Sequence, residues 1–173
     1  MALTAKTVLL VIDTQNVFAP MVKSAIPNIE MLFNCFDSFG QPTIFTQHGH
    51  TKEELTPPFK NQLVRKWGPD GSIAKVAKNT YDAFINTDLD QMLRDMEVER
   101  VVVCGVMTDC CCDTTARSAF NRGFETWLVA DACGSANTKQ HEAGLKGFGF
   151  AFGNVVQTKE TIGVLSKQWS ASL

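Results

Sequence analysis

Short, almost entirely apolar runs constrain the fold of this chain more than any other feature. Lys6–Asp13 (KTVLLVID) and Arg100–Cys104 (RVVVC) lack the polar alternation of a half-exposed strand, and such runs are typical of strands buried on both faces of a parallel sheet. Apolar residues at helical spacing follow the first run, as seen at Ile29, Leu32, Phe33 and Phe36. Because parallel neighbours need crossover connections, this alternation predicts a mainly parallel sheet with helices on both faces.

The same criteria predict the remaining elements. Further strands are expected at Pro42–Gln47, Ile73–Ala77, Thr126–Ala130 and Asn154–Gln157. Helices are expected at Leu89–Met96 (with Asp88 as its N-cap), Asp109–Asn121, Thr138–Phe148 and Lys159–Trp169. A long loop is expected at Thr51–Ser72, which is rich in proline and charge. We therefore predict a single-domain three-layer α/β/α sandwich over residues 1–173, with a Rossmann-like open sheet of about six mainly parallel strands.

Length, charge and cysteine usage narrow the possible functions. At 173 residues and 19.0 kDa, the chain can bury about 70 % of its surface, which is enough for a core without disulfides. The net charge of −2 and the pI of about 5.9 give no basic excess, so we expect neither nucleic acid nor a membrane as a partner. The apolar run from Val8 to Ile12 is too short to span a bilayer and lacks the features of a signal peptide. The six cysteines fit no disulfide framework, so we expect a reducing, cytoplasmic location.

Chemically useful side chains follow three of the expected strands. Asp13 ends the first strand, Lys78 follows Ile73–Ala77, and the Thr108–Cys112 turn follows Arg100–Cys104. In open α/β sheets, ligands bind beyond the C-terminal ends of the strands. A carboxylate, an ammonium group and a thiol are therefore expected at one edge of the sheet.

Three segments then resemble one family, in order and over nearly the whole chain. Val11–Phe18 (VIDTQNVF) resembles an apolar strand ending in Asp-x-Gln-x-x-Phe. Lys78–Asp90 (KNTYDAFINTDLD) resembles a Lys-x-x-Tyr-x-Ala-Phe segment, and Cys104–Phe120 (CGVMTDCCCDTTARSAF) resembles a Gly-x-x-Thr-x-x-Cys turn and its helix. The sequence is identified by them as a member of the isochorismatase-like cysteine hydrolase superfamily, which includes nicotinamidases and N-carbamoylsarcosine amidohydrolase.

The resemblance implies an Asp–Lys–Cys triad at Asp13, Lys78 and Cys111. Counting from Gly105 and Thr108 places Cys111, rather than either adjacent cysteine, in the nucleophile position. Free backbone N–H groups at this turn, those of Met107 and Cys111, are expected to form an oxyanion hole. The resemblance also implies a cis peptide bond between Val106 and Met107.

These residue types suit hydrolysis through a thioester. The thiolate is the nucleophile, and a helix N-terminus and a nearby lysine are expected to lower the pKa of the Cys111 thiol. Asp13 can accept the thiol proton and pass it to the leaving amine, while Lys78 fixes Asp13 by ion pairing. We therefore expect hydrolysis of a small amide or related carbonyl compound, with no organic cofactor.

Two other functions stay open at this point. One is isochorismatase-type hydrolysis of a vinyl ether with release of pyruvate, which needs an acid but no thiol. The other is a catalytically silent protein of the same fold that binds a small molecule. A redox role for the Cys110–Cys112 cluster is weaker, because adjacent residues on a helix point in different directions.

The remaining expectations concern the pocket, a metal and assembly. Nicotinamidases carry a metal site built from an aspartate, a histidine two positions later and a further histidine. Here His50 fits the first histidine position but His48 replaces the aspartate, so we expect the two histidines to line the pocket and no metal to bind. The other expected substrate contacts are Gln15, Phe18, Trp67, Tyr81 and, more weakly, Phe59. The resemblance also implies a homo-oligomer, either a dimer or a tetramer, and Thr51–Ser72 is the segment expected to form its interface.

Overall fold

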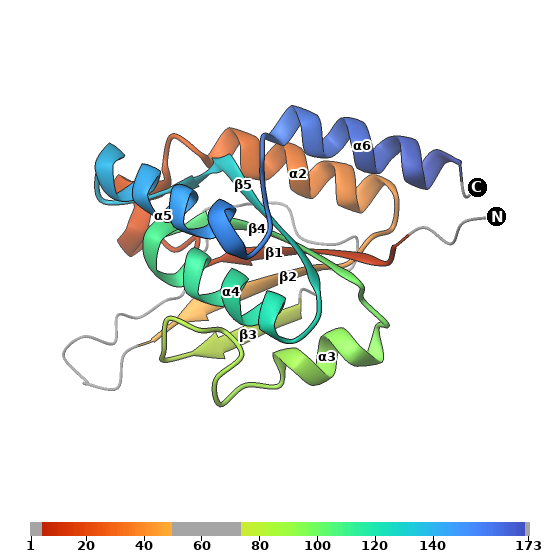
Figure 1. Cartoon of the computed structure of the whole chain (residues 1–173), viewed down its shortest axis with the longest axis horizontal. Helices are drawn as coiled ribbons and strands as arrows, with labels where there is room; N and C mark the ends of the chain where they lie inside the picture. The colour runs from red at the N-terminus through yellow and green to blue at the C-terminus, as the bar shows by residue number, and fades with distance from the viewer. Residues whose placement is uncertain (1–4, 50–73, 172–173) are drawn as a thin grey trace.

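The computed structural model describes residues 5–49 and 74–171 and contains one parallel sheet (Figure 1). Its six strands lie in the order β3-β2-β1-β4-β5-β6, and every neighbouring pair is parallel. The strands are β1 (Thr7–Ile12), β2 (Thr43–His48), β3 (Ala74–Lys78), β4 (Arg100–Val106), β5 (Glu125–Gly134) and β6 (Asn154–Val156). The predicted α/β fold with a parallel sheet of six strands is therefore confirmed.

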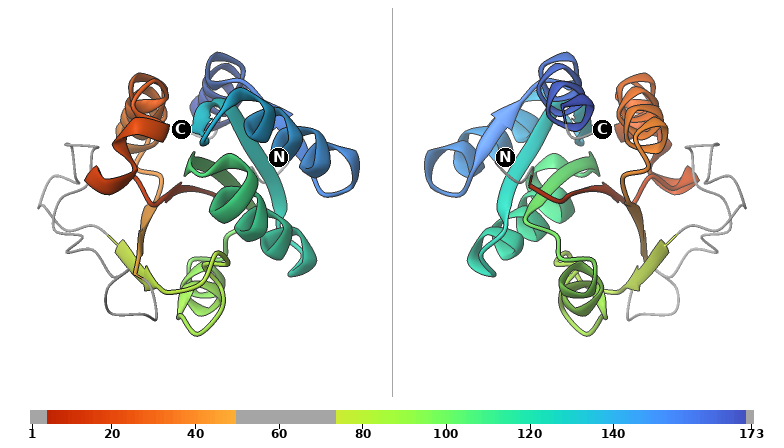
Figure 2. Two further views of the ribbon diagram at one scale, coloured as in Figure 1. Left: turned by 90° about the vertical axis from the view of Figure 1, so that its left-hand side faces the viewer. Right: turned by 90° about the vertical axis from the view of Figure 1, so that its right-hand side faces the viewer.

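Helices cover both faces of the sheet, as the two side views in Figure 2 show. The longer helices are α2 (Ile26–Ser38), α3 (Leu89–Asp95), α4 (Asp113–Asn121), α5 (Thr138–Ala151) and α6 (Thr158–Ser170). The short ones are η1 (Asn16–Phe18), α1 (Ala19–Val22) and the π-helical turn η3 (Thr108–Cys112). Apolar residues of α2 and α6 pack on one face, and those of α3, α4 and α5 pack on the other.

Strand β1 lies at the centre of both cores. Val8, Leu10 and Ile12 contribute to the core under α3, α4 and α5, whereas Leu9 and Val11 contribute to the core under α2 and α6. All five side chains are buried, because successive residues of a strand point to opposite faces and both faces are covered. Burial on both faces of the sheet therefore explains why the run from Val8 to Ile12 contains no polar residue.

Strands β1 and β4 meet where the order of the sheet reverses, which is the usual place for a ligand site. Gly105 of β4 lies opposite Ile12 and has a φ of 121°. A Cβ at this position would lie 2.1 Å from the carbonyl oxygen of Ile12, so only glycine fits without a shift of the backbone. This close approach brings the end of β1 beside the turn that follows β4.

Several predicted boundaries differ from the structure. Strands β4 and β5 extend beyond Cys104 and Ala130, and β3 includes Lys78 as its last residue. Asp88 occupies the N-cap position of α3 but makes no capping hydrogen bond; the Thr87 hydroxyl accepts from the Leu89 amide instead, at 3.3 Å. The helix expected from Asp109 begins as the π-helical turn η3. The expected loop Thr51–Ser72 lies outside the described residues.

Within the described ranges, the longest helices are too short or too polar to cross a membrane.

Candidate active site

Asp13 is held at the carboxyl end of β1 by the neighbouring strand. The Thr46 hydroxyl of β2 donates to Oδ1 of Asp13 at 2.6 Å and accepts from the Asp13 amide at 3.1 Å. Asp13 has a φ of 50°, a left-handed conformation that turns the chain away from the strand. The carboxylate is fully buried and is therefore a poor candidate for a mere surface cap.

Lys78 supplies the positive charge beside this carboxylate. Its Nζ lies 2.8 Å from Oδ2 of Asp13, and both side chains are completely buried. Nζ also donates to the Thr80 carbonyl at 3.0 Å and lies 2.9 Å from Nδ1 of His48. Lys78 therefore lies at the end of its strand, as expected, and its side chain is directed into the protein by three polar partners.

Cys111 lies in η3, directly after β4. The Met107 carbonyl accepts hydrogen bonds from the amides of both Cys110 and Cys112, at 3.1 and 3.0 Å, which defines the turn. The Val106–Met107 peptide bond that precedes the turn is cis. Single π-helical turns occur frequently at functional sites, and this one directs the Cys111 side chain toward the end of β1.

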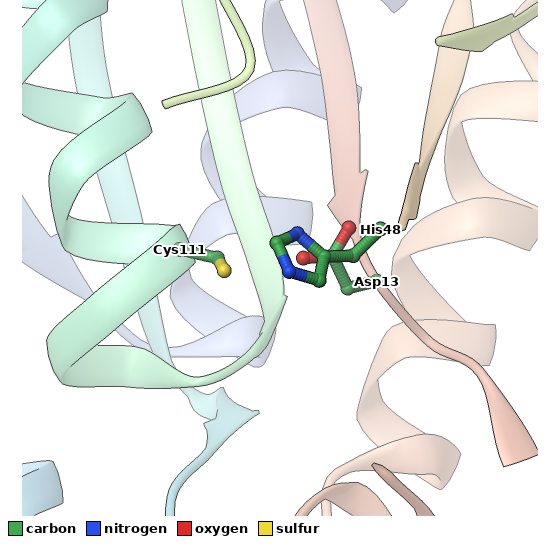
Figure 3. A group of neighbouring side chains, drawn as sticks. All are labelled: Asp13, His48 and Cys111. Atoms are coloured by element: carbon green, nitrogen blue, oxygen red, sulfur yellow. The ribbon is translucent and has the colours of Figure 1, made fainter. Parts of the chain in front are cut away.

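The structure brings Asp13, His48 and Cys111 together (Figure 3). One side-chain oxygen, one ring nitrogen and the sulfur all lie within 4.8 Å of one another. All three residues are buried, and they come from the ends of β1 and β2 and from η3. With Lys78 bound to Asp13, the three residues of the expected triad therefore occupy one buried cluster.

The thiol is not pre-ionised, contrary to the sequence-based expectation. Burial, followed by the negative charge of Asp13, raises the pKa of Cys111 to about 12; Lys78 acts in the opposite direction but with less effect. Burial also raises the pKa of the neighbouring thiols Cys104 and Cys112 well above its ordinary value. The expected lowering by Lys78 and a helix N-terminus is therefore outweighed by loss of solvent. At neutral pH, Cys111 is therefore a protonated thiol close to the carboxylate of Asp13.

Residues of α5 and of the segment that ends β5 hold the turn η3 in position. Asp109 accepts hydrogen bonds from the Ser135 hydroxyl and, at 3.0 Å, from Nε2 of Gln140. The Thr108 hydroxyl donates to the Gly134 carbonyl at 3.0 Å and lies 2.8 Å from Nδ1 of His141. Since that hydroxyl proton is directed to Gly134, the His141 ring donates to Thr108. These contacts were not predicted, because their partners lie 26 to 33 residues away in the sequence.

The expected pocket residues separate into two groups. Phe18 and Tyr81 flank the His48 ring, with ring centroids 6.4 and 6.1 Å away, so these three lie at the site. Gln15 is used differently: its Oε1 accepts from the His48 amide at 2.8 Å and its Nε2 donates to the His48 carbonyl at 3.4 Å. Gln15 therefore positions the end of β2. Trp67, Phe59 and His50 lie outside the described residues.

A cavity of about 480 Å³ lies beside the cluster. The described residues that line it are Gln47, Gly49, Ala77, Lys78, Asn79 and Asn86. Along β2, Gln47 points to the opposite face of the sheet from Thr46 and His48. Lys78 belongs both to the cluster and to the lining of this cavity, whereas Cys111 is not among the described lining residues.

Comparison with known proteins identifies the family of this chain. The family model for the isochorismatase domain matches residues 7–160. The chain belongs to the isochorismatase family. Nicotinamidase 3 of Arabidopsis thaliana is 35 % identical to this isochorismatase-family chain over 170 residues, covering 86 % of the chain and 83 % of the relative. Members of this family are hydrolases, and so is this chain.

Solved structures of the family share the fold. An isochorismatase-like hydrolase from Alkaliphilus metalliredigens has a TM-score of 0.82 at 24 % identity, covering 93 % of this chain and 99 % of that one. A pyrazinamidase of Pyrococcus horikoshii in complex with zinc has a TM-score of 0.79 at 26 % identity, covering 88 % of this chain and 99 % of that one. The parallel sheet and its helices are thus those of the family.

The cluster of Asp13, His48 and Cys111 does not fit a metal ion. Three donor atoms lie within 4.8 Å of one another, but the Lys78 ammonium contacts both Oδ2 of Asp13 and Nδ1 of His48. A divalent cation at this point would displace that ammonium or lie beside a like charge. The positive charge of the cluster is supplied by the protein itself.

Proposed function

We propose that this isochorismatase-family protein hydrolyses a small carboxamide, or a related carbonyl compound, through a thioester at Cys111. The observation that supports the proposal most strongly is the buried Asp13–Lys78 pair, with an Asp13 oxygen within 4.8 Å of the Cys111 sulfur. A nucleophile beside a base that is itself oriented by a third group is the arrangement required for acyl transfer.

The first half of the reaction forms the thioester. Asp13 accepts the proton of the Cys111 thiol as the sulfur attacks the carbonyl carbon, because a thiol with a pKa of about 12 has almost no thiolate at neutral pH. The carbon–nitrogen bond then breaks, and Asp13 returns the proton to the leaving ammonia or amine. Lys78 remains paired and compensates the charge of Asp13 in its ionised state.

The second half releases the acid. Water loses a proton to Asp13 and attacks the thioester carbonyl, and the carbon–sulfur bond breaks as the sulfur regains a proton. In both halves, negative charge develops on the carbonyl oxygen, and the backbone N–H groups of Met107 and Cys111 are the donors that we assign to it.

Relatives favour an amide substrate. A nicotinamidase and a pyrazinamidase are among the similar proteins, and both names describe enzymes that act on aromatic carboxamides. Planar substrates of this type would be flanked by the rings of Phe18, His48 and Tyr81. We therefore place aromatic carboxamides first among the compounds to be tested.

The test is a substrate panel assayed with the wild type and with Cys111→Ala. The panel contains nicotinamide, pyrazinamide, N-carbamoyl amino acids and isochorismate, and ammonia and pyruvate are measured separately. We expect ammonia from at least one amide, and a loss of more than about 1,000-fold in the variant. Pyruvate release that survives in Cys111→Ala would support the vinyl-ether route and overturn the proposal.

A further inference from the structure

The ammonium group of Lys78 has more than one side-chain partner. Beyond Oδ2 of Asp13 at 2.8 Å and the Thr80 carbonyl at 3.0 Å, its third contact is Nδ1 of His48 at 2.9 Å. The strand register explains this contact, because His48 of β2 and Lys78 of β3 are paired directly. Their side chains therefore point to the same face of the sheet, toward Asp13.

We propose that His48 is a positioning residue that holds the Lys78 ammonium on Asp13. This inference rests on the proposed function, since it assigns His48 to the machinery that supports Asp13 as the base. His48 acts through Lys78, and the reaction as written needs no covalent or proton-transfer step at the imidazole.

The contact determines the protonation of the imidazole. An ammonium group has three N–H donors and no acceptor, so a hydrogen bond between Nζ and Nδ1 requires an unprotonated Nδ1. His48 is therefore neutral and carries its proton on Nε2. The buried ammonium is thus ion-paired with Asp13 and has hydrogen-bond partners in His48 and the Thr80 carbonyl, as a buried charge requires.

The surroundings keep the ring in place. The side-chain amide of Gln15 binds the main chain of His48 twice. Its Oε1 accepts from the His48 N–H at 2.8 Å, and its Nε2 donates to the His48 carbonyl at 3.4 Å. The ring lies near Phe18 and Tyr81, and only 8 % of the residue is exposed. A ring held in this way presents Nδ1 to Lys78 at a defined place, which limits where the ammonium can lie relative to Asp13.

A matched pair of variants tests the role of Nδ1. His48→Asn places an acceptor oxygen near the position of Nδ1, whereas His48→Leu has a similar size but no acceptor. For His48→Leu we expect kcat to fall about 10- to 100-fold on the best amide, because one hydrogen bond to a charged group is lost. His48→Asn is expected to stay within about fivefold of the wild type. Thermal unfolding verifies that both variants are folded. An equal loss of kcat in the two folded variants would overturn the proposal.

A second measurement does not depend on activity. Long-range ¹H–¹⁵N spectra report which imidazole nitrogen carries the proton, and the chain has only three histidines, so the His48 signals can be assigned by their loss in His48→Asn. We expect Nδ1 unprotonated and Nε2 protonated at neutral pH, and a proton on Nδ1 would overturn the inference. If the wild type hydrolyses no amide of the panel, the proposed function fails, while this spectrum still tests the contact between His48 and Lys78 on which the inference depends.

Discussion

The Nζ atom of Lys78 lies 2.8 Å from Oδ2 of Asp13, and neither side chain is exposed. The two residues are far apart in the sequence and meet because β1 and β3 flank β2, whose Thr46 and His48 also contact the pair. A buried ion pair adds little net stability compared with apolar residues, but losing one partner is costly. We infer that the pair is retained for chemistry rather than for folding.

Removing Lys78 should destabilise the fold strongly. In Lys78→Met, Asp13 becomes a buried charge without a partner, and we expect the free energy of unfolding to fall by about 3–5 kcal/mol. In the double variant Asp13→Asn/Lys78→Met neither charge remains, and most of this loss should be recovered. Urea denaturation of the wild type, both single variants and the double variant measures the effect. Additive losses in the double variant would show that the two side chains do not act as a pair.

Asp13→Asn should make the Cys111 thiol more reactive toward alkylation but should decrease turnover of the substrate. Asp13 raises the pKa of Cys111 while Lys78 lowers it, so removal of the carboxylate lowers that pKa. Alkylation of Cys111 by iodoacetamide at pH 8 is therefore expected to be faster in the variant, whereas turnover falls about 100- to 10,000-fold through loss of the base.

Peptide mapping provides an internal control for this prediction. Cys35 lies on α2, where its pKa is raised by burial alone, and its labelling rate should be the same in both proteins. A parallel decrease in labelling and turnover would mean that Asp13 does not oppose ionisation of the thiol.

Alkaline stability should depend on Cys111. Its pKa rises from 9.0 to about 12 on folding, so the folded state keeps a proton that the unfolded state loses above pH 9. The contribution of this protonated thiol to the free energy of unfolding is full below pH 9 and decreases as the pH approaches 12. The free energy of unfolding should decrease between pH 9 and pH 11 in both proteins. We expect this decrease to be roughly 2 kcal/mol smaller in Cys111→Ala than in the wild type. Parallel stability curves for the two proteins over this range would contradict the assignment.

Gly144 permits the close contact between α5 and the turn η3. A Cβ at this position would lie 2.8 Å from Cα of Asp109, so Gly144→Ala must displace the backbone of η3 or α5. We expect a loss of about 1–3 kcal/mol in stability and at least a tenfold loss of kcat. Gly163→Ala on α6 is the matched control: nothing lies within 4 Å of its Cβ, and stability should rise by about 0.4–1 kcal/mol with activity unchanged. Loss of kcat in both variants would argue against a specific role for this contact.

The sequence was sufficient to predict the sheet because its strands are buried on both faces. In β1 an unbroken apolar run from Val8 to Ile12 has few other interpretations, and the strand appears as expected. The position of Asp13 follows, since a carboxylate directly after such a strand lies at the ligand-binding edge. Lys78 and the Thr108–Cys112 turn were expected at the same edge because they also follow strands, whereas the choice of Cys111 among three adjacent cysteines came from the resemblance.

Features that depend on contacts between distant segments were not predictable. The π-helical form of η3 accompanies the packing of Asp109 against Gly144, 35 residues further along the chain. The spacing of apolar residues in the sequence does not indicate this contact or the π-helical turn. The contact between His48 and Lys78 requires the register of β2 against β3. The pKa of Cys111 was predicted in the wrong direction, because a sequence shows a nearby lysine but not the degree of burial.

The most direct test of the account is a search for the covalent intermediate. The wild type is mixed with an excess of its best amide, quenched in acid within the first turnovers, and examined by intact mass spectrometry and peptide mapping. We predict a mass gain equal to the acyl part of the substrate, located on the peptide containing Cys111 and absent from Cys111→Ala. Turnover without an adduct, together with near-full activity of Cys111→Ala, would contradict a thioester mechanism.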